Sequence, residues 1–159
     1  MDRIKWCMRV RNGIELIDPN SNLAEAYLGK AEDSLETMRL AESRDWKISA
    51  AYYTMYFSLY AILMKIGIKC EIHKCTIECM NFFLTDHFDR EEYELMKESL
   101  GARIGAQYFI DRNVTDAFFK RMMHKAPEFL VKCKSVVLKL DERKINQIRI
   151  KIEKMKRKG

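Results

Sequence analysis

The sequence predicts an all-α fold, an antiparallel up-and-down bundle of four to five main helices. Three observations predict it. The 159 residues include only 6 Gly and 2 Pro, too few for a sandwich or barrel that turns about every ten residues. Apolar residues recur at helical spacing along most of the chain. Finally, 48% hydrophobic and 33% charged residues describe a globular chain that can hold a core without a metal or disulfide.

The N-terminal segment, residues 1–21, is expected to be a helix followed by a turn. A helix over residues 1–17 would place Trp6 and Leu16 against the core. The residues that follow it, rich in Pro, Asn and Ser, have turn composition.

The bundle itself is expected to span residues 22–140. Its first helix begins at Asn22, which has an acidic residue three positions on, as in a capping box, and runs to about Glu42. A second helix over residues 46–66 ends at Gly67, a residue suited to the left-handed position after a helix.

This second helix includes residues 48–64, which carry no charge and approach the length of a membrane span. Its tyrosine hydroxyls need hydrogen-bond partners. A narrow polar stripe also follows it at helical period, and we therefore predict a central helix of a bundle and no membrane contact. The stripe consists of Lys47, Thr54, Ser58 and Lys65.

Three further helices complete the pattern. A short one is expected over residues 73–84, and the next begins at Asp89, with Glu92 completing a capping box. The longest follows the break at residues 111–113 and contains Pro127. A proline inside a helix removes one backbone hydrogen bond, so we expect a kink or a position where that bond can be spared.

The C-terminal segment, residues 141–159, is predicted to be a basic helical tail. It carries a net charge of +5 of the chain's +6. Its isoleucines recur at heptad-like spacing. The tail is interpreted first as a solvated helix end, and binding of nucleic acid, an acidic partner or anionic lipid is the alternative.

The five cysteines raise the question of metal binding, because Cys70, Cys75 and Cys79 lie near His73. Their spacing fits no paired zinc knuckle, and Cys75 and Cys79 share a helix face with apolar residues. We therefore expect no metal and no cofactor. An odd cysteine count without an apolar leader predicts reduced thiols and a cytoplasmic protein.

Two polar positions interrupt an apolar stripe. The stripe of the helix that begins at Asp89 should continue at Arg103 and Gln107, where the sequence places polar side chains among small residues. A polar group on a core face is costly unless it is paired. Arg103 is therefore either a buried ion-pair partner or a phosphate contact in a cleft, and the interruption favours the second.

Several motifs occur in an order that resembles a known family. They are the run Ala50-Ala51-Tyr52-Tyr53-Thr54-Met55-Tyr56, then Gly67-Ile68 and His73, then Arg103 with Ala106, Gln107 and Tyr108, and finally Ala126-Pro127-Glu128-Phe129. Over about residues 22–138 the chain is similar to the HEPN (higher eukaryotes and prokaryotes nucleotide-binding) domain family, in its small stand-alone prokaryotic branch.

The resemblance implies a helical bundle, usually a homodimer, with the polar motif near the dimer cleft. Many members are metal-independent ribonucleases with an Arg-x4–6-His motif. Others pair with a minimal nucleotidyltransferase in toxin–antitoxin systems, and in some of these pairs the transferase adenylylates a tyrosine beside the motif. Here Arg103 is followed five residues later by Tyr108 and not by histidine. A phenol is a poor general base at neutral pH.

Three functions follow as hypotheses. The first is a nucleotide- or RNA-binding partner of a minimal nucleotidyltransferase, with Arg103, Gln107, Tyr108 and His73 as binding residues. The second is a ribonuclease toxin with a variant Arg103-x4-Tyr108 site. The third is a non-catalytic adaptor. Tyr108 alternatively belongs to the core or an interface, and His73 caps a helix or lies in the core. The other tyrosines are interpreted as core or dimer interface, and they are Tyr52, Tyr53, Tyr56 and Tyr60.

Overall fold

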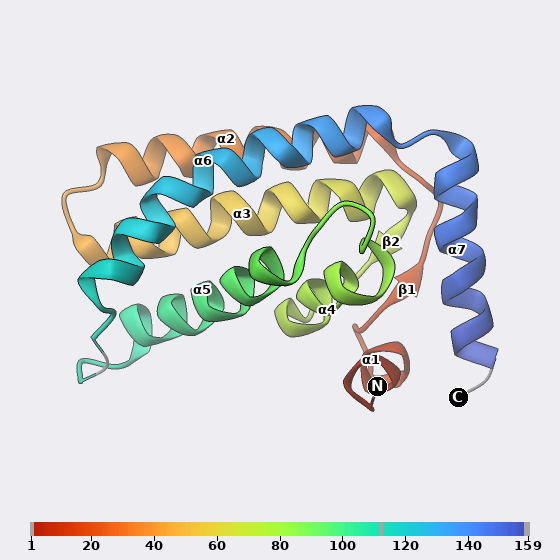
Figure 1. The fold of residues 1–159 in the computed structure, drawn as a ribbon, viewed down its shortest axis with the longest axis horizontal. Coiled ribbons are helices and arrows are strands. Elements are labelled where there is room, and N and C mark those ends of the chain that lie inside the picture. Colours follow the sequence, from red (N-terminus) through yellow and green to blue (C-terminus); the bar gives the residue numbers. More distant parts are fainter. Residues whose placement is uncertain (1, 112, 158–159) are drawn as a thin grey trace.

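The computed structural model describes residues 2–111 and 113–157, so parts of the predicted N-terminal helix, of the break around residue 112 and of the basic tail lie outside the described residues. Figure 1 shows the elements in chain order. They are α1 Asp2–Arg9, β1 Glu15–Leu16, α2 Ser21–Leu40, α3 Arg44–Ile66, β2 Ile68–Lys69, α4 His73–Phe83, α5 Arg90–Tyr108, α6 Asp116–Lys139 and α7 Glu142–Arg157.

The predicted all-α bundle is confirmed. The long helices α2, α3, α5 and α6 run up and down beside one another, and α7 crosses the end of this bundle where α3 finishes (Figure 1). Helix α3 lies at the centre and packs against α2, α5 and α6. Nearly every residue of α3 from Ile48 to Ile66 is buried, which explains why its sequence is apolar almost all round.

The prediction for the N-terminal segment is wrong in part. The helix ends at Arg9, and residues 15–16 form a short strand that pairs antiparallel with residues 68–69. Asn12 adopts a positive φ of 62° in the intervening turn, which a continuous helix does not allow. Trp6 is 52% exposed and does not enter the core, whereas Leu16 packs partly buried against it.

Helix termini follow local chemistry closely. The Asp89–Glu92 capping box is present as predicted, and Gly67 ends α3 with φ 83° in the left-handed region. Helix α2 begins earlier than predicted, because the Asn20 side chain, and not that of Asn22, accepts the backbone N–H of Leu23.

Helix α7 contributes structure as well as charge. The Arg149 guanidinium donates to the backbone carbonyls of Ile17 at 2.7 Å, Ile66 at 3.1 Å and Gly67 at 3.2 Å. It therefore satisfies carbonyls at the C-terminal end of α3, where a cation also complements the helix dipole. One basic side chain of the tail is thus a structural cap. Ile145 and Ile152 bury the inner face of the same helix.

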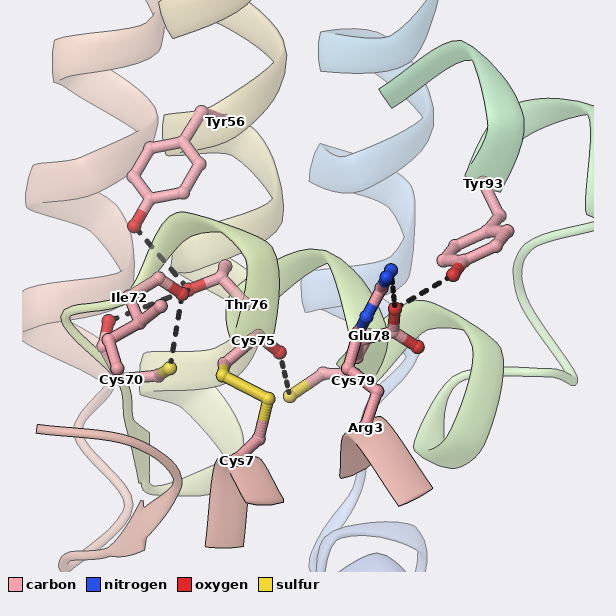
Figure 2. The surroundings of a disulfide bond; sticks show 10 residues. All are labelled: Arg3, Cys7, Tyr56, Cys70, Ile72, Cys75, Thr76, Glu78, Cys79 and Tyr93. Atoms are coloured by element: carbon pink, nitrogen blue, oxygen red, sulfur yellow. Dashed lines mark hydrogen bonds and ion pairs between the residues drawn. A yellow bond between two sulfur atoms is a disulfide. The ribbon is translucent and has the colours of Figure 1, made fainter. Parts of the chain in front are cut away.

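A disulfide between Cys7 and Cys75 joins α1 to α4 (Figure 2). The expectation that every cysteine remains a thiol is therefore wrong for this pair, while Cys70, Cys79 and Cys133 are buried thiols. The Cα atoms of the pair lie 5.5 Å apart although 68 positions separate them in the chain. Only the packing of α1 against α4 brings them together, and nothing in their spacing signals it.

The same contact between α1 and α4 holds a buried carboxylate. Glu78 accepts from the Arg3 guanidinium at 3.2 Å and from the Tyr93 hydroxyl at 2.9 Å (Figure 2). Burial and the neighbouring Glu78 carboxylate raise the pKa of Tyr93 to about 12, so the phenol keeps its proton. Helix α4 is thus held to α1 by the disulfide and by the Arg3–Glu78 ion pair, and to α5 by the Tyr93 hydrogen bond.

Across residues 2–111 and 113–157, no helix combines the length and the apolar character that a membrane crossing needs.

Candidate functional site

Arg103 lies near the end of α5, and its guanidinium packs over the rings of two tyrosines of α3. The Cζ atom is 5.6 Å from the ring centroid of Tyr52 and 5.2 Å from that of Tyr53. Its Nε donates to Oε1 of Gln107 at 3.3 Å, one helical turn on. Among the described residues no carboxylate pairs with it. Aromatic rings therefore hold this cation in place, and its charge is left without an anion.

His73, the first residue of α4, contacts the same tyrosine rings of α3 that lie under Arg103. Its ring stacks on Tyr56 with centroids 4.1 Å apart and planes 9° apart. Its Nδ1 lies 2.7 Å from the Tyr52 hydroxyl. Burial, with a smaller contribution from the Arg103 guanidinium, lowers the pKa of His73 below its ordinary value. The fold thus gathers Arg103, Gln107 and His73 around one group of tyrosines.

The hydrogen bond to Tyr52 determines which nitrogen of His73 carries the proton. Tyr52 is fully buried, and burial raises the pKa of its phenol, with a further contribution from Tyr56, so the hydroxyl stays protonated. Within the described residues, this hydroxyl has no acceptor other than Nδ1 of His73. Tyr52 therefore donates to Nδ1, and the neutral imidazole presents an N–H at Nε2.

The interpretation of the tyrosine stripe as core is confirmed for Tyr52, Tyr56 and Tyr60, which are at most 7% exposed. Their hydroxyls reach polar groups around α4, and Tyr60 for example accepts the backbone N–H of Cys70 at 3.2 Å. Tyr53 differs, because it is only partly buried, lies under Arg103 and lines a surface hollow. The amino-acid sequence alone does not distinguish Tyr53 from the other tyrosines of the stripe.

Tyr108 lies beside this group without joining it. It is the last residue of α5 and is 68% exposed. Together with Gln107 and the exposed Trp46 it lines a hollow of about 370 Å³ between the start of α3 and the end of α5. Neither a hydrogen bond nor a ring contact connects it to Arg103 or His73 in the described part of the chain. Its hydroxyl is available to a partner.

The cysteines around His73 do not form a metal site in the described residues, where no group of three or more His, Cys, Asp and Glu side chains is placed to hold an ion. Cys75 is in the disulfide and is not a thiolate ligand. Cys79 is buried, and its Sγ donates to the carbonyl of Cys75 at 3.4 Å (Figure 2). Burial raises the pKa of the Cys79 thiol well above its ordinary value.

The bundle that builds this site is also the part of the chain that resembles known proteins. A protein-family model for the HEPN domain matches residues 22–136. A relative from Methanocaldococcus jannaschii, named "Putative toxin MJ0142", is 27% identical over an alignment of 119 residues that covers 72% of this chain and 81% of that protein. Because the family model spans well over half of the sequence, the protein belongs to the HEPN domain family.

Proposed function

We propose that the protein is a nucleotide- or RNA-binding HEPN component of a toxin–antitoxin-type system, acting as a homodimer together with a minimal nucleotidyltransferase. One observation carries the proposal: the Arg103 guanidinium stands beside His73 with no carboxylate to neutralise it in the described residues. A fixed cation of this kind suits a phosphate, because the guanidinium fork matches phosphate geometry.

Other groups at the site add donors for the same anion. The Nε2–H of His73 is one of them. His73 is also the first residue of α4, and Ile72 before it supplies no side-chain cap, so the helix presents uncapped N–H groups there. Gln107 holds Arg103 through Nε and leaves the Nη groups for a ligand. Together these donors support binding of the phosphate backbone of RNA or of a nucleotide.

The geometry favours binding over cleavage. Attack by a ribose 2′-hydroxyl needs a general base close to the phosphate-binding cation. The nitrogen of His73 that would accept a proton is already used by Tyr52, and Tyr108 makes no contact with Arg103. The site therefore has the cation that a ribonuclease needs and lacks an available base in the described residues.

A ribonuclease toxin is the second candidate. The name of the Methanocaldococcus relative favours it, as does the presence of an imidazole beside Arg103. The same samples decide between the two functions: radiolabelled single-stranded RNA stays intact if the protein only binds it. Cleavage that is lost on Arg103→Ala supports the ribonuclease. A protein that does not cleave RNA, and binds neither RNA nor a free nucleotide at low salt, refutes both functions and leaves the adaptor.

Binding is expected to depend on pH through His73. The lowered pKa keeps the imidazole neutral at pH 7 in the unliganded protein. A phosphate beside the ring favours its charged form, in which Nδ1 donates to the Tyr52 oxygen and no longer accepts from it. Binding therefore takes up a proton and becomes tighter as the pH falls from about 7.5 to about 5.5. Fluorescence anisotropy titrations with labelled RNA at constant ionic strength measure this. His73→Gln should lose the dependence.

His87→Gln is the matched control, because burial lowers the pKa of His87 as well but its ring lies in the loop between α4 and α5. If the His73 and His87 variants keep equal pH dependence, His73 does not contact the anion.

Tyr108 is the expected site of modification by the partner transferase. In the reaction its phenol oxygen attacks the α-phosphorus of ATP, the bond between the α- and β-phosphates breaks, pyrophosphate leaves and the phenol proton passes to solvent. The 68% exposure of the side chain suits this chemistry, whereas Tyr52 is buried. After co-expression with a transferase encoded beside the gene, intact-mass spectrometry should find one added AMP per chain. Tyr108→Phe should abolish the addition, and AMP on another residue would contradict the assignment.

A further inference from the structure

A surface hollow beside Arg103 has the walls of a nucleobase site. It has a volume of about 290 Å³ and lies between α2, α3 and the end of α5. Three aromatic side chains contribute to its lining, and its remaining walls are small or polar. The full lining is Ser34, Thr37, Trp46, Ser49, Ala50, Tyr53, Phe57 and Gln107.

Two residues line this hollow and also contact Arg103, the proposed phosphate-binding residue. Tyr53 lines the hollow and carries the Arg103 guanidinium over its ring at 5.2 Å. Gln107 lines the hollow and accepts from Nε of Arg103. An apolar slot therefore adjoins an unneutralised cation. A nucleotide has this same division, with a flat apolar base attached to an anionic phosphate.

The polar groups of the hollow suit the edge of a base. Ser49 is 3% exposed, and its hydroxyl has no hydrogen-bond partner among the described residues. A buried hydroxyl without a partner costs free energy that a ligand can recover. The Ser34 and Thr37 hydroxyls are already satisfied, since they donate to the carbonyls of Lys30 and Asp33 at 2.9 Å. Gln107 offers amide N–H donors in addition.

We propose that this hollow, called here the base slot, binds an unstacked nucleobase of single-stranded RNA whose phosphate lies on Arg103. Trp46 is 64% exposed at the slot and is the aromatic surface on which the base stacks. Aromatic stacking is typical of single-strand recognition and tolerates any base. This inference rests on the proposed function, because it assigns a base site next to the phosphate site.

The test uses Trp46 as its own reporter. The chain has two tryptophans, and Trp6 is exposed on α1, so Trp6→Phe leaves Trp46 as the sole indole without disturbing the core. Two RNA probes are titrated, a hexa-adenylate and an abasic hexamer with the same phosphates. The hexa-adenylate should quench Trp46 fluorescence and bind more tightly than the abasic probe.

Two substitutions localise the effect. Trp46→Ala should lower the affinity for hexa-adenylate about tenfold and leave the abasic probe unchanged. Trp6→Ala, at a tryptophan of comparable exposure on α1, should leave both affinities unchanged. Equal affinities for the two probes, with binding still lost on Arg103→Ala, would overturn the base slot and leave the phosphate site standing.

Failure of the proposed function gives a different result. If Arg103→Ala leaves RNA binding unchanged, the phosphate site is refuted, and adenosine, which has no phosphate, then tests the slot alone. Quenching of Trp46 by adenosine, weakened by Ser49→Ala, supports the slot. An unchanged spectrum at saturating adenosine overturns it.

Discussion

Arg103→Ala is expected to weaken binding of single-stranded RNA by roughly ten- to a hundredfold, the value of one charge-assisted phosphate contact. The guanidinium has no anionic partner of its own among the described residues, so removing it leaves no buried charge behind. The slope of log Kd against log salt should also fall by about one unit, because one fewer counterion is released. Anisotropy titrations at several salt concentrations measure both quantities.

Two further variants separate binding from folding. Arg103→Lys keeps the charge without the planar fork, and its affinity should lie between those of the native protein and the alanine variant. Arg39→Ala removes an exposed arginine of α2 that pairs with Glu36, and it should leave RNA affinity nearly unchanged. The stacking of Arg103 on Tyr52 and Tyr53 contributes about 1 kcal/mol, so urea unfolding should show only a modest loss of stability. Equal losses of affinity for the Arg39 and Arg103 variants would refute a specific phosphate site.

The largest expected effect on stability comes from the disulfide. Replacing Cys7 and Cys75 together by alanine should lower the free energy of unfolding by about 4 kcal/mol, because the bond closes a loop across 68 positions and restricts the unfolded chain. Guanidinium unfolding with and without a dithiol reductant measures it. In the native protein the dithiol reduces the Cys7–Cys75 bond to two thiols and is itself oxidised to a disulfide. The reductant should therefore lower the guanidinium midpoint of the native protein, as the double substitution does.

The control is Cys79→Ala, which removes a buried thiol beside the disulfide without opening the loop. This substitution should lower the free energy of unfolding by only about 1 kcal/mol, the contribution of one buried side-chain group. The double alanine variant should also stop responding to the reductant. A midpoint that is the same in the native protein and in the double variant would show that this cross-link does not stabilise the fold.

Local patterns were sufficient for much of the bundle. The charge-free run of α3 and its end at Gly67 were predicted correctly, as was the capping box at Asp89 and Glu92, because caps and apolar period depend on residues within a few positions of one another. The prediction that Trp6 faces the core was wrong, because the orientation of its helix is not a local property. The short helix α1 is amphipathic in pattern, but which of its apolar residues faces the core depends on where that helix docks.

For the candidate site, too, some features were predictable from local sequence and others depend on how the helices pack. Arg103 was recognisable from the sequence because a charged residue interrupts an apolar stripe, a property of one helix. Its neighbour His73 lies thirty residues away on another helix, and only the packing of that helix brings the two side chains near each other. The support of the guanidinium by Tyr53, and the hollow that Trp46 borders, likewise arise from the packing of α5 against α3.

Short-range periodicity and the order of motifs were enough to predict the helical class, most helix boundaries, the position of the unusual arginine and the family resemblance. The packing of the helices was needed to show that Arg103 and His73 lie against the same tyrosine, that Cys7 bonds to Cys75, and that Arg149 caps α3 and is not merely solvated. These contacts join residues far apart in the chain, and their geometry is set by how whole helices pack, which no local pattern encodes.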